Sequence, residues 1–70
     1  MCIAVPGRIL SIKNEEALVA VMGIEVLVNV AFLEVIKPGE WVMVHTGYAI
    51  SKIEEEEAKA LEAILDGLGE

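Results

Sequence analysis

The sequence is poor in residues that small proteins use for chemistry or for covalent stability. It has one cysteine, one histidine and one each of the three aromatic residue types. A single cysteine cannot form a disulfide within the chain, so the domain is not stapled and internal disulfide exchange is excluded. A nucleophile elbow, a glycine-rich phosphate loop, a CxxC pair and an HExxH helix are all missing. These absences give little support to covalent catalysis.

Basic residues and long apolar runs are also scarce. Five basic residues face twelve acidic ones, and the net charge of -7 divides into -2 over residues 1–51 and -5 over residues 52–70. Such a chain repels phosphate backbones, so we expect no nucleic-acid partner. No apolar run reaches the roughly 18 residues of a membrane span. Because Pro6, Gly7 and Arg8 interrupt the first apolar stretch, no secretory signal is expected either. We predict a cytoplasmic protein with no membrane partner.

The residues that are present favour a small, mainly β domain. Hydrophobic residues make up 56% of the 70 residues, and up to about residue 50 they alternate with polar ones and are often β-branched. This pattern predicts a small β-barrel over residues 1–51. Residues 52–70 have a different, acidic composition and are predicted to form a C-terminal helix appended to the same domain.

Three strands are predicted in the first half of the chain. The first covers residues 8–12, with Pro6 and Gly7 at its start, where the missing proline N–H does least harm to a ladder. The next two cover residues 17–22 and 24–30, joined through Gly23. In the third strand, one face carries Ile24, Val26, Val28 and Val30, and the other carries Glu25, Leu27 and Asn29. This alternation predicts a half-buried strand.

A turn and a further strand are predicted next. After a short strand or turn over residues 33–36, Lys37-Pro38-Gly39-Glu40 is typical of a type II turn. A strand is then expected over residues 41–49. Val42 and Val44 would face the core, and the opposite face would carry Trp41, Met43 and His45.

The last segment has the pattern of an amphipathic helix. Ser51-Lys52-Ile53-Glu54 fits a capping box, so we expect the helix to begin near residue 52. Its apolar stripe would consist of Ile53, Ala60, Leu61, Ile64, Leu65 and Leu68. The stripe either docks on the chain's own barrel or binds in a groove of a partner.

Two linked motifs identify a family. Residues 1–9 read M-C-x-x-V-P-G-R-I, and residues 38–50 read P-G-E-W-V-x-V-H-x-G-Y-A-I. Together they resemble the HypC/HupF family of NiFe-hydrogenase maturation chaperones. The resemblance implies a non-enzymatic carrier with an OB-like β-barrel and a C-terminal α-helix.

The resemblance also implies partners and a cargo. In that family the N-terminal cysteine, here Cys2, is essential for association with the scaffold protein HypD and with the hydrogenase large-subunit precursor. The cargo is an iron centre that carries CN and CO ligands and is held transiently with the HypD partner. Cys2 and His45 are the candidate metal-binding residues. The candidate partner-binding residues are Cys2, Pro6, Gly7, Arg8, Trp41, Met43 and His45.

The residues themselves leave several roles open. A lone thiol is often inert, although a thiolate is a soft ligand suited to low-spin iron. Three roles remain open for His45: a second iron ligand, a base for the thiol, or only a hydrogen-bonding residue. Two other function classes remain as alternatives: a small OB-type binding module for nucleic acid or another ligand, and a single-cysteine thiol enzyme.

Overall fold

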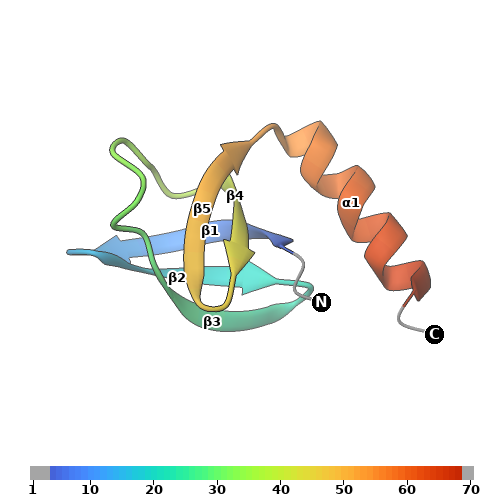
Figure 1. The fold of residues 1–70 in the computed structure, drawn as a ribbon, viewed down its shortest axis with the longest axis horizontal. Helices are drawn as coiled ribbons and strands as arrows, with labels where there is room; N and C mark the ends of the chain where they lie inside the picture. Colours follow the sequence, from blue (N-terminus) through green and yellow to red (C-terminus); the bar gives the residue numbers. More distant parts are fainter. Residues whose placement is uncertain (1–3, 69–70) are drawn as a thin grey trace.

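The alternating pattern of the first 50 residues produces a barrel of five strands. In the computed structural model, which describes residues 4–68, the barrel is closed and one helix follows it (Figure 1). The strand order around the barrel is β1-β2-β3-β5-β4. The elements are β1 (Val5–Lys13), β2 (Glu16–Val21), β3 (Ile24–Asn29), β4 (Trp41–His45), β5 (Tyr48–Ile53) and α1 (Glu55–Leu68). The prediction of a small β-barrel with a C-terminal helix is confirmed.

Two-residue turns make all three hairpins of residues 4–68, at residues 14–15, 22–23 and 46–47. Met22 and Gly23 have φ of 51° and 85°, and Thr46 and Gly47 have φ of 48° and 86°. Positive φ at both central positions is the type I′ geometry, whose twist matches that of paired strands. The prediction of one strand over residues 41–49 is therefore wrong, because the chain reverses at residues 46 and 47 and returns as β5.

The same reversal displaces the predicted start of the helix. Ser51 lies in β5 opposite Met43, so it pairs in the sheet and does not cap a helix. The N–H of Ala58 donates to the carbonyl of Glu54 at 2.9 Å, and α1 begins at Glu55. The prediction of a capping box at Ser51 is wrong because the β4–β5 ladder takes up the backbone of residues 48–53.

The first strand is longer than its pattern suggests. β1 starts at Val5, so Pro6 and Gly7 lie within the strand and not at its start. Both residues are buried. The barrel core consists of Ile9, Ala17, Val19, Val28, Val30, Val42, Val44 and Ala49.

The predicted core faces are largely confirmed. Val28 and Val30 of the third strand region are buried and Val26 is half-buried. Ile24 is the exception, since 65% of its surface is exposed. It directly follows the Met22–Gly23 turn, where the strand has just begun and the barrel wall no longer covers it.

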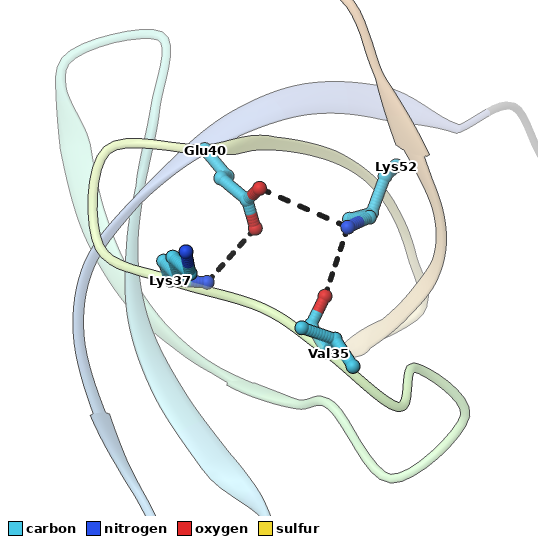
Figure 2. Close-up of polar contacts among 4 residues, drawn as sticks. All are labelled: Val35, Lys37, Glu40 and Lys52. Atoms are coloured by element: carbon cyan, nitrogen blue, oxygen red, sulfur yellow. Dashed lines mark hydrogen bonds and ion pairs between the residues drawn. The ribbon is translucent and has the colours of Figure 1, made fainter.

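The loop between β3 and β4 is held by polar contacts. Gly39 has φ of 95°, and the N–H of Glu40 donates to the carbonyl of Lys37 at 3.1 Å, which confirms the type II turn. The Lys37 N–H donates to Glu40 Oε1 at 2.8 Å (Figure 2). Lys52 of β5 donates from Nζ to the carbonyl of Val35 at 2.9 Å and lies 3.7 Å from Glu40 Oε2. These contacts fasten the loop to β5.

The helix packs on the outside of β1 and β4. Ala58 is fully buried, whereas Leu61 and Leu65 are half-buried. Ala60 and Ile64 are exposed, so the apolar stripe is rotated relative to the predicted one. The prediction that the helix docks on its own barrel is confirmed. Over residues 4–68, no helix has the length and apolar character needed to cross a membrane.

Candidate functional site

The candidate site is built on the outer face of β4. Val42 and Val44 are buried in the barrel, whereas Trp41, Met43 and His45 alternate with them and are half-buried. This is the alternation predicted from the sequence. The three candidate side chains therefore project from one strand on the side away from the core.

The register of β1 against β4 adds two more candidates to this face. Pro6 is the ladder partner of Met43, and Arg8 is the partner of Trp41. Side chains of directly opposed residues lie on the same face of a sheet. We call the outer surface formed by Pro6, Arg8, Trp41, Met43 and His45 the β1–β4 face. Residues more than 30 positions apart in sequence are thus brought together.

Gly7 lies on the other side of β1. A Cβ on Gly7 would lie too close to Cγ1 of Val19, and 3.0 Å from Cγ2 of Val21, so the position admits no side chain. Pro6 is on the outer face but is less than 2% exposed. The burial of both residues gives them a packing role. Their predicted contact with a partner stays a prediction.

The start of the described chain lies at the His45 end of β4. Val5 pairs with Val44, so Ala4 continues β1 toward His45. Cys2, the principal candidate, lies outside the described residues. The expectation that the N-terminal segment lies beside this end of the barrel stays a prediction.

His45 occupies the last position of β4, directly before the hairpin turn. Its backbone pairs with Tyr48, and its carbonyl accepts a hydrogen bond from Oγ1 of Thr46 at 2.7 Å. Within residues 4–68, no group of three or more His, Cys, Asp or Glu side chains is placed to hold a metal ion. His45 alone does not make a metal site in this part of the chain, and its predicted metal role stays a prediction.

Tyr48 is a neighbour of His45 that strand alternation alone does not identify. It follows the Thr46–Gly47 turn and opposes His45 in the ladder, with 44% of its surface exposed. The sequence feature that could have predicted this position is the Thr46-Gly47 pair between two apolar runs, since such pairs form the two-residue turns of hairpins. Its ring lies 5.5 Å from that of Phe32, centroid to centroid.

A groove with acidic walls adjoins the β1–β4 face. It lies beside Trp41, between the β3–β4 loop and the first turn of α1, and Lys52 is its cationic lining residue. The remaining lining residues are Gly39, Glu40, Ile53, Glu54, Glu55 and Glu57. Carboxylates near a helix N-terminus are favoured by the helix dipole, which accounts for those on α1. The negative charge disfavours phosphate at this position.

The comparisons with known proteins agree with the resemblance of the two motifs. The HupF/HypC family model matches residues 1–65. The hydrogenase maturation factor HypC of Azotobacter chroococcum mcd 1 is 39% identical over 71 residues, which cover 100% of this chain and 84% of that protein. The hydrogenase maturation factor HybG of Escherichia coli (strain K12) is 45% identical over 67 residues, with 86% of this chain and 82% of HybG covered. HypC of Helicobacter hepaticus is 39% identical over 61 residues, with 84% and 71% covered. With this match along nearly the whole chain, the protein belongs to the HupF/HypC family of hydrogenase maturation factors.

Proposed function

We propose that this protein is a non-enzymatic chaperone of NiFe-hydrogenase maturation that acts in the cytoplasm. It binds a HypD-like scaffold protein and the precursor of the hydrogenase large subunit, and it helps to assemble and deliver the iron centre. The observation that carries this proposal is the family match over residues 1–65. The clustering of the predicted contact residues on the β1–β4 face supports it.

The cargo is iron bearing CN and CO ligands, and Cys2 is its proposed ligand on this chain. A thiolate is a soft donor that suits an iron centre already holding strong-field ligands. Two residues, Ile3 and Ala4, stand between Cys2 and Val5, and an extended chain spans at most about 10–11 Å over the three Cα-to-Cα steps. Val5 pairs with Val44, and we propose that the thiol reaches the end of the barrel that carries His45.

Because α1 packs against β1 and β4, the part of the β1–β4 face that the helix leaves uncovered supplies the proposed contact area for the scaffold. Trp41 and Met43 are large apolar side chains that remain half-exposed in the isolated chain. Aromatic residues, methionine and arginine are the types enriched in protein interfaces. Arg8 is exposed beside Trp41 and completes this set. His45 lies at the last position of β4. Its proposed role is that of a second iron ligand, a base for the thiol or a hydrogen-bonding residue.

The test is to express the protein with the HypD homologue of its host, purify the complex without oxygen and record its infrared spectrum. We expect bands of bound cyanide and carbon monoxide on the complex. A Cys2→Ala variant should fold with an unchanged melting temperature but yield neither complex nor bands. A large loss of melting temperature with maturation retained would show instead that Cys2 is structural.

Two outcomes would favour other function classes. Tight binding of single-stranded DNA or RNA at low salt would contradict the chaperone function and indicate an OB-type nucleic-acid module. Turnover of peroxide with a thiol pKa depressed on titration would indicate a thiol enzyme. We do not expect nucleic-acid binding, because the chain carries a net charge of -7 and three aromatic residues. We do not expect peroxide turnover, because the sequence has no motif of a thiol enzyme.

A further inference from the structure

The barrel closes through a very short ladder between β3 and β5. These strands run parallel and share the single pair Asn29 and Tyr48, with the Asn29 N–H donating to the carbonyl of Gly47 at 2.9 Å. The other four ladders each contain at least four residue pairs. Figure 1 shows β5 rising away from β3 beyond their meeting point near the β4–β5 turn. Most of β3 therefore has a sheet neighbour only on its β2 side.

The register of the β2–β3 hairpin shows which backbone groups face the open side. Val21 and Ile24 flank a two-residue turn, and such a pair exchanges hydrogen bonds, after which bonded and non-bonded pairs alternate. The backbone groups of Val26 therefore face β2, while those of Glu25 and Leu27 face away from it. Two further hydrogen bonds agree with this alternation of backbone directions along β3. Asn29 donates on the open side to Gly47, and Val30 donates on the other side to Glu15 at 2.8 Å. Within residues 4–68, the outward backbone groups of Glu25 and Leu27 have no strand partner.

Exposed apolar side chains lie on β3 and where it meets β5: Tyr48 opposes Asn29, and the ring of Phe32 lies 5.5 Å from that of Tyr48. Leu27 is 66% exposed and Phe32 is 67% exposed, and on β5 the outward residues Tyr48 and Ile50 are 44% and 46% exposed. We call these four side chains, with the free backbone of Glu25 and Leu27, the β3 edge surface. Contiguous exposed apolar area on a soluble domain commonly marks an interaction site.

The edge lacks the usual protection against strand addition. Natural edge strands are commonly blunted by lysine, proline, a bulge or a covering segment. β3 contains neither lysine nor proline, and its ladder with β2 has an unbroken register over six pairs. Its one charged residue is Glu25. An edge left in this form favours the addition of an extended segment through backbone hydrogen bonds, with alternate side chains contacting the surface beside it.

We propose that the open edge of β3 receives an extended segment of a partner protein as an added strand. The segment is apolar at alternate residues, to cover Leu27 and its neighbours, and carries lysine or arginine near Glu25. The inference rests on the proposed function, because the partners that bring the segment are the scaffold protein or the large-subunit precursor. It assigns to them a second contact, distinct from the β1–β4 face.

The net charge of the chain favours a partner segment over a second copy of this chain as the strand that pairs with β3. Each chain carries a net charge of -7, so pairing two copies edge to edge brings like charges together, including the two Glu25 side chains. A basic residue in the added segment replaces this repulsion with attraction. The acidic chain therefore selects a basic partner segment.

Amide hydrogen exchange on the intact protein tests the edge first. In the free chain, the amide of Leu27 should exchange rapidly, whereas the amides of Val26 and Val28, which face β2, should be protected. The complexes with the scaffold protein and with the large-subunit precursor are then measured separately. In at least one of them, the Leu27 amide should gain at least tenfold protection. If it gains protection in neither complex, the inference is overturned.

Variants at Leu27 separate backbone pairing from side-chain contact. Leu27→Pro removes the outward N–H and is compatible with an edge strand, because no bond to β2 is lost. It should weaken partner binding at least tenfold. Leu27→Thr keeps the N–H and the strand preference but removes most of the apolar contact, so it should weaken binding less. Glu25→Lys should also weaken binding, through loss of its attraction to the basic residue.

The outcomes distinguish this inference from the proposed function. If both complexes form and all three variants bind as the wild-type chain does, strand addition is wrong and the maturation role stands. If neither partner binds the wild-type chain, the proposed function fails and the inference fails with it. A dimer of the isolated chain that is lost in Leu27→Pro would show that a second copy occupies the edge, and it would also overturn the inference.

Discussion

Gly7 of β1 lies directly against Val19 of β2 in the barrel interior. A Cβ at Gly7 would approach Cγ1 of Val19 more closely than side chains tolerate, and Val21 and Val44 close the space on the other sides. The Pro6–Gly7 pair in the N-terminal motif thus has a packing function. It lets β1 lie close to its neighbours while Pro6 and Arg8 stay on the outer face.

The first prediction follows from that contact. Gly7→Ala should lower the free energy of unfolding by about 1–3 kcal/mol, as overpacked cores do. Chemical denaturation measures the change. The matched control is Gly67→Ala in α1, where an added Cβ meets nothing within 4 Å. That variant should be neutral or gain up to about 1 kcal/mol from improved helix propensity. Equal stability of the two variants would contradict the close packing at Gly7.

Helix docking is tested with two alanines on the same helix. Ala58 is fully buried, whereas Ala60 is exposed. Ala58→Leu should cost about 1–3 kcal/mol because the larger side chain separates α1 from β1 and β4. Ala60→Leu should change stability by no more than about 0.5 kcal/mol. Denaturation followed by circular dichroism gives both values, and a neutral Ala58→Leu would mean that α1 does not pack on the barrel.

Met43 tests the β1–β4 face as a binding surface. Met43→Glu should raise the dissociation constant of the scaffold complex at least tenfold, or roughly 1.4 kcal/mol. Stability should fall by less, since the half-exposed side chain keeps contact with water. Val35→Glu is the control, because Val35 is also apolar and is 65% exposed but lies in the β3–β4 loop and not on β1 or β4. Titration calorimetry compares the two, and unchanged binding by Met43→Glu would remove Met43 from the interface.

His45 is expected to act after scaffold binding. His45→Ala should lower the yield of matured hydrogenase by about tenfold, the size of effect typical for residues that support a metal site. It should not prevent co-purification with the scaffold, since Cys2 is still present. His45→Gln keeps hydrogen-bonding capacity but is a poor base and a poor iron ligand. Full activity of the glutamine variant would leave only a hydrogen-bonding role, and full activity of both would exclude His45 from the site.

Much of the candidate site was predictable because it depends on local periodicity. Alternation along residues 41–45 correctly separates the buried valines from Trp41, Met43 and His45. It does not reveal that Pro6 lies beside Met43. That neighbour relation depends on the register between strands that are distant in sequence, and a pattern within either strand does not specify it.

Predictions from local patterns were wrong where one segment was compatible with both a helix start and a strand. Ser51-Lys52-Ile53-Glu54 has the residues of a capping box, yet Ser51 pairs with Met43 in β5. The sheet prevails because the Thr46–Gly47 turn returns the chain alongside β4, where its backbone groups bond to a strand already in place. Nucleating a helix one turn earlier would have given up that ladder.

The sequence by itself determined the faces of residues 41–45, the turns at Gly23 and at Pro38–Gly39, the acidic first turn of the helix and the family motifs, since each depends on residues within a few positions of one another. Only the tertiary structure decided the register that assembles the β1–β4 face and the divergence that leaves one side of β3 open. It also decided which side of α1 is buried, placing Ala58 inward and Ile64 outward. These features depend on contacts between distant segments, whose geometry is fixed only when the barrel closes.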